Sequence, residues 1–103
     1  MRHTGYAHKV DRNQDQIRRE LRALGFRVDT VSRLKKLYDL VVTGRMFGTN
    51  EVRTVRVEVK MPGEKLTVDE IEYHNSEPYP ETLLIATSTE SVLNWYHHME
   101  QEE

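Results

Sequence analysis

Two runs of strand-forming residues between positions 37 and 60 most constrain the fold of this chain. The runs cover residues 37–42 and 55–60, and a glycine-containing segment separates them, which is the pattern of a β-hairpin. In the second run valines alternate with charged residues, and successive side chains of a strand project to opposite faces. Glu58 and Lys60 are therefore expected side by side on one face of a sheet.

Asp39 lies in the middle of the first run, although aspartate is depleted in strand interiors. If the hairpin pairs, Asp39 approaches Glu58 and Lys60 from the adjacent strand, and we call these three residues the charged trio. Two carboxylates a few ångströms apart repel, and a divalent cation with oxygen ligands would relieve that repulsion. Alternatively, Glu58 and Lys60 form a solvated ion pair worth about 0–1 kcal/mol.

The length of 103 residues predicts a single domain with one core, near the size at which a partner subunit often completes it. The absence of cysteine excludes disulfides and thiolate metal sites. Residues 1–60 hold 14 Lys and Arg against 7 Asp and Glu, whereas residues 61–103 hold 1 against 10. A polyanion would be attracted to the first part, unless the two parts neutralise each other in the folded protein.

The predicted domain organisation is a basic N-terminal arm over residues 1–10, one domain over 11–99 and an acidic tail over 100–103. No apolar run reaches the length of a signal peptide or a membrane span, which predicts a cytoplasmic protein without membrane contact. The predicted elements, in chain order, are helix 11–24, strands 26–31, 37–42 and 55–60, helix 67–75, strand 82–87 and a last helix from residue 88 or 89. Three consecutive strands flanked by helices predict an α+β fold.

Other polar residues could serve the charged trio. Gln16 and Glu20 lie one turn apart on the flank of the first helix, from which they could reach over the sheet. Positive charge near the trio would neutralise phosphates. The candidate DNA-binding residues are Lys9, Arg12, Arg33, Lys35 and Lys36. The other interpretation of all these residues is ordinary surface polarity.

The ordered set of these motifs resembles the PD-(D/E)XK nuclease superfamily, and within it the small stand-alone virus-type replication-repair nucleases (VRR-NUC) of phages and bacteria. The likeness covers about residues 11–95. It depends on the segments 11–17, 21–25, 38–42, 57–60, 65–70 and 86–93. It implies a restriction-endonuclease-like core, α-β-β-β-α-β-α, with a central mixed sheet in an α/β three-layer-like arrangement.

The resemblance implies metal-dependent phosphodiester hydrolysis. Asp39 and Glu58 would bind one or two Mg²⁺ or Mn²⁺ ions with help from the Val59 carbonyl, and Lys60 would lie beside the attacking water. Gln16 would be a fourth catalytic residue, at a position where the family commonly has glutamate. An amide brings no negative charge, so Glu20 from the next turn is a possible substitute.

The leading functional hypothesis is a homodimeric endonuclease selective for branched DNA, such as Holliday junctions or flaps, in phage or bacterial replication, recombination or repair. An exposed apolar hairpin tip at Met46 and Phe47, together with Trp95 in the last helix, would suit a dimer interface. One alternative is a weak or inactive nucleic-acid-binding module of the same fold, marked by Gln16. Another is a protein-interaction module in which the charged trio is a structural ion network.

Overall fold

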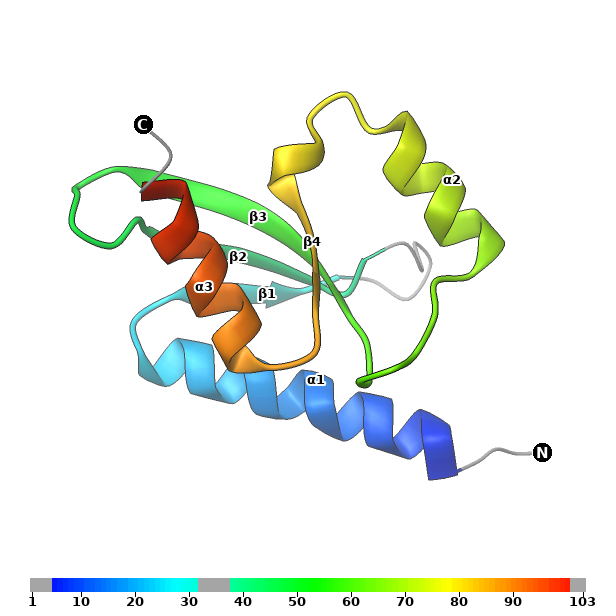
Figure 1. Ribbon diagram of the computed structural model, residues 1–103. Coiled ribbons are helices and arrows are strands. Elements are labelled where there is room, and N and C mark those ends of the chain that lie inside the picture. The colour runs from blue at the N-terminus through cyan, green and yellow to red at the C-terminus, as the bar shows by residue number, and fades with distance from the viewer. Residues whose placement is uncertain (1–4, 32–37, 101–103) are drawn as a thin grey trace.

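The computed structural model describes the backbone of residues 5–31 and 38–100, and the side chains of residues 12–31 and 38–97. The elements follow the predicted order of a helix, three strands, a helix, a strand and a helix (Figure 1). Their bounds are α1 Gly5–Ala23, β1 Arg27–Thr30, β2 Leu40–Arg45, β3 Val52–Val59, α2 Val68–Ser76, the 3-10 turn η1 Pro80–Thr82, β4 Leu83–Ala86 and α3 Thr89–Glu100. The α+β class is therefore confirmed. Within the described ranges, no helix combines the length and the apolarity that crossing a membrane requires.

The four strands form one mixed sheet in the order β1-β2-β3-β4. The β1–β2 and β2–β3 pairs are antiparallel, whereas β3 and β4 are parallel. Side chains alternate along β3, so its valines at positions 55, 57 and 59 point to one face of the sheet, which we call the apolar face. Arg56 and Glu58 point to the opposite face, which we call the polar face.

Helices α1 and α3 cover the apolar face (Figure 1). Ile17 and Leu21 of α1 and Val92 and Tyr96 of α3 are at most 1% exposed and pack in one core with the β3 valines. The Tyr96 hydroxyl lies 3.1 Å from the Val42 carbonyl oxygen, so its buried O–H has an acceptor. This face therefore has the composition of an ordinary hydrophobic core.

The ends of α1 only partly match the sequence pattern. The helix begins at Gly5, six residues before the predicted start at Asp11. Its last residue is Ala23, and Gly25 lies just beyond that end as predicted, with φ 98° and its N–H donated to the Arg22 carbonyl oxygen at 3.0 Å. Glycine adopts this left-handed conformation without the strain that a Cβ would cause.

The tip of the β2–β3 hairpin is not the exposed apolar surface that the sequence predicts. Met46 is 3% exposed and belongs to the core. The Phe47 ring lies 4.5 Å, centroid to centroid, from the His97 ring of α3. The hairpin therefore folds back on α3, and the prediction for Met46 is wrong.

Helix α2 lies over the polar face, on the other side of β4 from α3 (Figure 1). Its N-terminus carries the predicted capping box. The Glu70 N–H donates to Thr67 Oγ1 at 3.2 Å, and the Thr67 N–H donates to Glu70 Oε1 at 2.9 Å. Near the end of β3, helices thus lie on both faces of the sheet.

Candidate functional site

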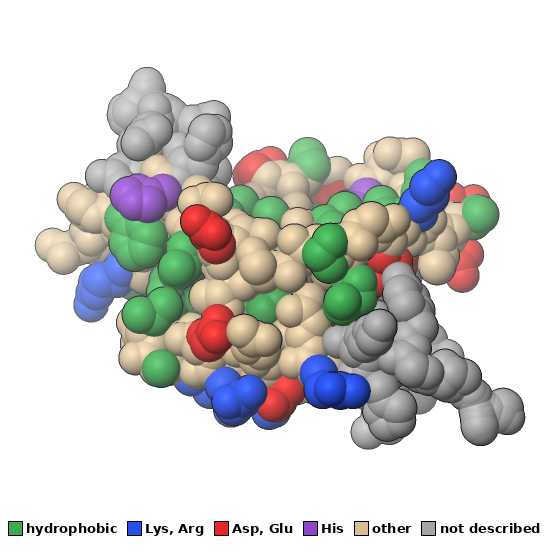
Figure 2. All heavy atoms as spheres, turned by 60° about the horizontal axis from the view of Figure 1, so that its bottom comes forward, with side chains coloured by type: hydrophobic (Ala, Val, Ile, Leu, Met, Phe, Trp, Pro, Cys, Tyr) green, Lys and Arg blue, Asp and Glu red, His purple; other side chains and the backbone are tan. Residues whose placement is uncertain are grey.

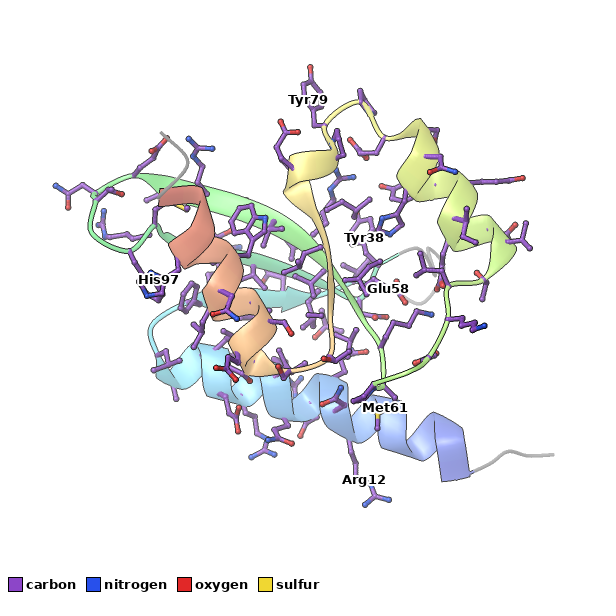
Figure 3. The ribbon with its side chains drawn as sticks, viewed as in Figure 1. Arg12, Tyr38, Glu58, Met61, Tyr79 and His97 are labelled. Atoms are coloured by element: carbon purple, nitrogen blue, oxygen red, sulfur yellow. The ribbon has the colours of Figure 1, made fainter. Side chains whose placement is uncertain are left out.

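The charged trio comes together where β2 begins and β3 ends. Asp39 directly precedes β2, and its N–H donates to the Val57 carbonyl oxygen at 2.7 Å. Its Oδ2 accepts the Val59 N–H at 2.7 Å. These two bonds hold the Asp39 carboxylate against the last residues of β3, beside Glu58, whose side chain lies on the α2 side of β4 (Figure 3).

Lys60 lies among three carboxylates, of which Glu64 and Glu70 are not in the charged trio. Its Nζ is 2.8 Å from Glu70 Oε1, 3.5 Å from Glu64 Oε2 and 3.6 Å from Glu58 Oε2. Lys60, Glu58 and Glu70 are only 5–6% exposed. We call Asp39, Glu58, Glu64 and Glu70, together with the Lys60 ammonium that they surround, the carboxylate cluster.

Sequence reasoning assigned no site role to Glu64 or Glu70. Glu70 had a sufficient explanation as the helix cap, and the capping pattern contains no signal for burial. Glu64 is brought back toward Lys60 by a turn in which its Oε1 accepts the Met61 N–H at 2.8 Å and its N–H donates to the Met61 carbonyl oxygen at 2.9 Å. The glycine before it, Gly63, has φ 86°. The i, i+4 spacing of Lys60 and Glu64 was the only signal in the sequence.

Burial dominates the electrostatics of the cluster. It raises the pKa of Glu58 to about 8, and the nearby charges of Asp39 and Glu70 add to the shift. Burial also raises the pKa of Asp39, although the hydrogen bond from the Val59 N–H opposes it. Burial likewise opposes the charged form of Glu70, but the Lys60 ammonium and the Thr67 N–H outweigh it and lower the Glu70 pKa. Of these three carboxyl groups, Glu58 is therefore the one whose protonated form burial and the neighbouring charges favour most near neutral pH.

The cluster has donor atoms that suit a hard divalent cation. Glu58 Oε1 is buried and has no hydrogen-bond partner among the described atoms, which is costly for a carboxylate oxygen. In those parts of the chain, no three His, Cys, Asp or Glu side chains are arranged to hold a metal ion. Mg²⁺ is usually bound through one or two carboxylates, with water and substrate phosphates as the other ligands. Asp39 and Glu58 supply the two carboxylates that such a Mg²⁺ site needs.

Gln16 and Glu20 contact each other rather than the charged trio. Gln16 Nε2 donates to Glu20 Oε2 at 3.0 Å, and Glu20 Oε1 accepts the Thr89 hydroxyl of α3 at 2.6 Å. Both line a groove of about 460 Å³ between α1 and the start of α3. Among the described residues, the hydrogen bonds thus direct these two side chains toward α3.

Among the α1 side chains that the structure describes, Asn13, one turn before Gln16, contacts the site. Its Nδ2 donates to the carbonyl oxygens of Lys60 at 3.2 Å and Thr87 at 3.1 Å, at the ends of the parallel strands β3 and β4. Val59 contacts Asp39 through its N–H, whereas the resemblance implied its carbonyl as a metal ligand. Asn13 was missed because nothing in the sequence shows which turn of α1 crosses the strand ends.

Most of the predicted DNA-binding side chains, Lys9, Arg33, Lys35 and Lys36, lie outside the described residues. Arg12 is exposed and points away from the body of the protein (Figure 3). Arginine side chains line the described part of the edge formed by α1, with acidic side chains between them (Figure 2). The described part of this edge is thus mixed in charge rather than uniformly basic.

Arg56, two residues before Glu58 on the polar face, fastens α2 to the sheet. Its Nη1 donates to the Tyr73 hydroxyl at 2.7 Å, and its Nη2 donates to Thr82 Oγ1 at 2.8 Å. Nη2 also lies 2.9 Å from Glu77 Oε1. The guanidinium is 5.8 Å from the centroid of the Tyr38 ring, within cation–π range.

No family model, no curated protein and no solved structure matches this chain.

Proposed function

We propose that this protein is a metal-dependent DNA endonuclease that hydrolyses phosphodiester bonds at the carboxylate cluster. The observation that supports it best is the buried, unpartnered Oε1 of Glu58, which lies beside Asp39 and two residues before Lys60. The resemblance of the sequence to the PD-(D/E)XK nucleases of VRR-NUC type supports the same assignment. We propose that the order of helices and strands corresponds to a restriction-endonuclease-like core.

In this proposal Asp39 and Glu58 are the residues that would hold Mg²⁺ or Mn²⁺. The bound ion would lower the pKa of a coordinated water and offset the negative charge that develops on the phosphate. Lys60 would stabilise the attacking water and the phosphate oxygens with its ammonium, because a buried cation interacts more strongly with negative charge than one in bulk water. Asp39 is held in place for this role by the Val57 carbonyl oxygen and the Val59 N–H.

Branched DNA is the proposed substrate, and a homodimer the proposed active form. Both follow from the resemblance, since stand-alone relatives of this size look like junction resolvases. Exposed arginines on α1, at positions 12, 19 and 22, would approach the phosphate backbone. A two-fold dimer would place two active sites across one branch point.

The direct test is cleavage of labelled four-way junctions, flaps and linear duplexes with Mg²⁺, Mn²⁺ or EDTA. We expect cutting that requires metal and falls at least about 100-fold in Glu58→Ala and Lys60→Ala. Glu51→Ala is the matched control, because Glu51 is an exposed glutamate at the other end of β3 and pairs with Arg53. A protein that binds these DNAs but cuts none with either metal would contradict the proposal.

The second candidate function is nucleic-acid binding without catalysis. It is favoured by Gln16, which brings no charge and donates its amide to Glu20 instead of meeting the charged trio. Such a module would bind DNA with strong salt dependence and equally well in EDTA. If wild type binds without cutting, Gln16→Glu tests whether one added carboxylate restores cleavage.

A further inference from the structure

Helix α2 is attached to the protein by polar contacts rather than by an apolar stripe. Its only buried residue is Glu70. The apolar residues Val68 and Ile71 are 71% and 44% exposed. A helix on the surface of a globular protein normally buries its apolar side chains against the core. The docking of α2 therefore has another basis.

Polar contacts hold α2 to β3 at two points. Near its C-terminus, Arg56 bonds to the Tyr73 hydroxyl and pairs with Glu77, the residue that follows the helix. At its N-terminus, Glu70 pairs with Lys60. Because a buried ion pair gains little net stability, the second contact is better explained by what it does to Lys60.

Three elements besides β3 converge on Lys60. Its N–H donates to the Ala86 carbonyl oxygen of β4 at 2.9 Å. Its own carbonyl oxygen accepts the Asn13 amide of α1 at 3.2 Å. Its ammonium meets Glu70 of α2 at 2.8 Å, the shortest of its three carboxylate contacts. Hydrogen bonds to α1 and β4 thus fix the backbone of Lys60, and the contact with α2 fixes the end of its flexible side chain.

We propose that Glu70 is the positioning residue for Lys60 and that α2 is docked to deliver it. The capping box fixes the Glu70 carboxylate, because Oε1 accepts the Thr67 N–H as well as the Lys60 ammonium. Glu70 acts through Lys60, since the oxygen that meets the ammonium is the one that the cap N–H holds in place. The inference rests on the proposed nuclease function, in which the place of the ammonium affects the chemical step.

The test compares Glu70→Ala, Glu70→Gln and Thr67→Ala. Glu70→Ala removes both the cap and the partner of Lys60, whereas Thr67→Ala removes the hydroxyl half of the capping box and leaves Glu70 in place. We expect Glu70→Ala to lower kcat for DNA cleavage about 10–100-fold at unchanged KM. Glu70→Gln keeps an oxygen that accepts from Thr67 and Lys60, and should recover most of kcat. Thr67→Ala should lower the melting temperature but not kcat.

A readout without DNA separates this inference from the nuclease proposal. The chain has five lysines, so the side-chain ammonium resonance of Lys60 can be assigned by its loss in Lys60→Arg. In metal-free protein it should be sharp in wild type and Thr67→Ala, and broadened or shifted in Glu70→Ala. An unchanged resonance, or equal kcat in Glu70→Ala and Thr67→Ala, would overturn the inference. Loss of the resonance in Glu70→Ala with no cleavage by wild type would support the positioning and overturn the nuclease function.

Discussion

The two faces of the sheet are held to their helices by different forces. On the apolar face, α1 and α3 bury Ile17, Leu21, Val92 and Tyr96 against the β3 valines. On the polar face, α2 buries a single glutamate, and ion pairs through Lys60 and Arg56 join it to β3. The two sets of contacts come from the same strand, one residue apart, because of the period-two alternation.

This difference separates stability from chemistry. Apolar burial is non-directional and independent of pH, and it supplies most of the free energy of folding. Buried carboxylates cost free energy unless they are paired, protonated or bound to a cation. The contribution of the polar face to stability should therefore depend on pH and on bound metal, whereas that of the apolar face should depend only on the volume of its side chains. The predictions below test that contrast, from the largest expected effect to the smallest.

Truncation on the apolar face should have the largest effect. Leu21→Ala should lower the free energy of unfolding by about 3–5 kcal/mol, because Leu21 is completely buried and its loss leaves a cavity. Urea denaturation followed by circular dichroism measures this. Leu24→Ala, at a position 58% exposed directly after the same helix, is the control and should change little. Equal losses at both positions would contradict the assigned core.

The metal-free protein should lose stability as pH rises from about 5 to 8. Glu58 keeps its proton in the folded state up to about pH 8 but releases it near 4.5 when unfolded. Over that window, the free energy of unfolding should fall by up to about 1.4 kcal/mol per pH unit, on the order of 4 kcal/mol in all, while Lys60 stays protonated in both states. Urea titrations in EDTA should show this slope in wild type and a flatter one in Glu58→Gln.

Added Mn²⁺ should reverse the loss at pH 8 in wild type but not in Glu58→Gln, because a cation that binds only the folded state stabilises it. A wild-type stability that does not change with pH in EDTA would contradict the pKa assigned to Glu58.

Overpacking the apolar face should cost less. A Cβ at Gly44 would overlap the Phe26 ring, so Gly44→Ala should lower the free energy of unfolding by about 1–3 kcal/mol. The neighbouring Thr54→Val, at an exposed position on the polar face, should stay within about 0.5 kcal/mol. A greater loss of unfolding free energy in Thr54→Val than in Gly44→Ala would contradict the assignment of the close packing to the apolar face.

The smallest effect should be local and confined to the polar face. Arg56→Gln removes the ion pair with Glu77 and should weaken the docking of α2 by about 1–2 kcal/mol. Hydrogen exchange would show faster exchange for the amides of α2 and no change for those of α3. Acceleration in both helices would mean that α2 and the core unfold as one unit.

The order and type of the elements were predictable because each carries a local signal. The valine alternation of β3, the glycine that ends α1 and the Thr67 capping box all depend on neighbours within a few residues. The start of α1 was placed six residues late, because residues 5–10 have no apolar repeat, and helical backbone can continue without one. Met46 was assigned to the surface because a hairpin pattern does not show whether its tip folds back on a helix.

By itself, the sequence determined that Asp39 on one side of a hairpin meets Glu58 and Lys60 on the other, because strand alternation and hairpin pairing are short-range rules. Only the tertiary structure decided that Glu70 and Asn13 meet Lys60, since they come from helices 10 residues after and 47 residues before it in the chain. Which turn of a helix faces a strand end depends on how the whole core packs. That packing also sets the burial that moves the Glu58 pKa, and no local pattern of residues contains it.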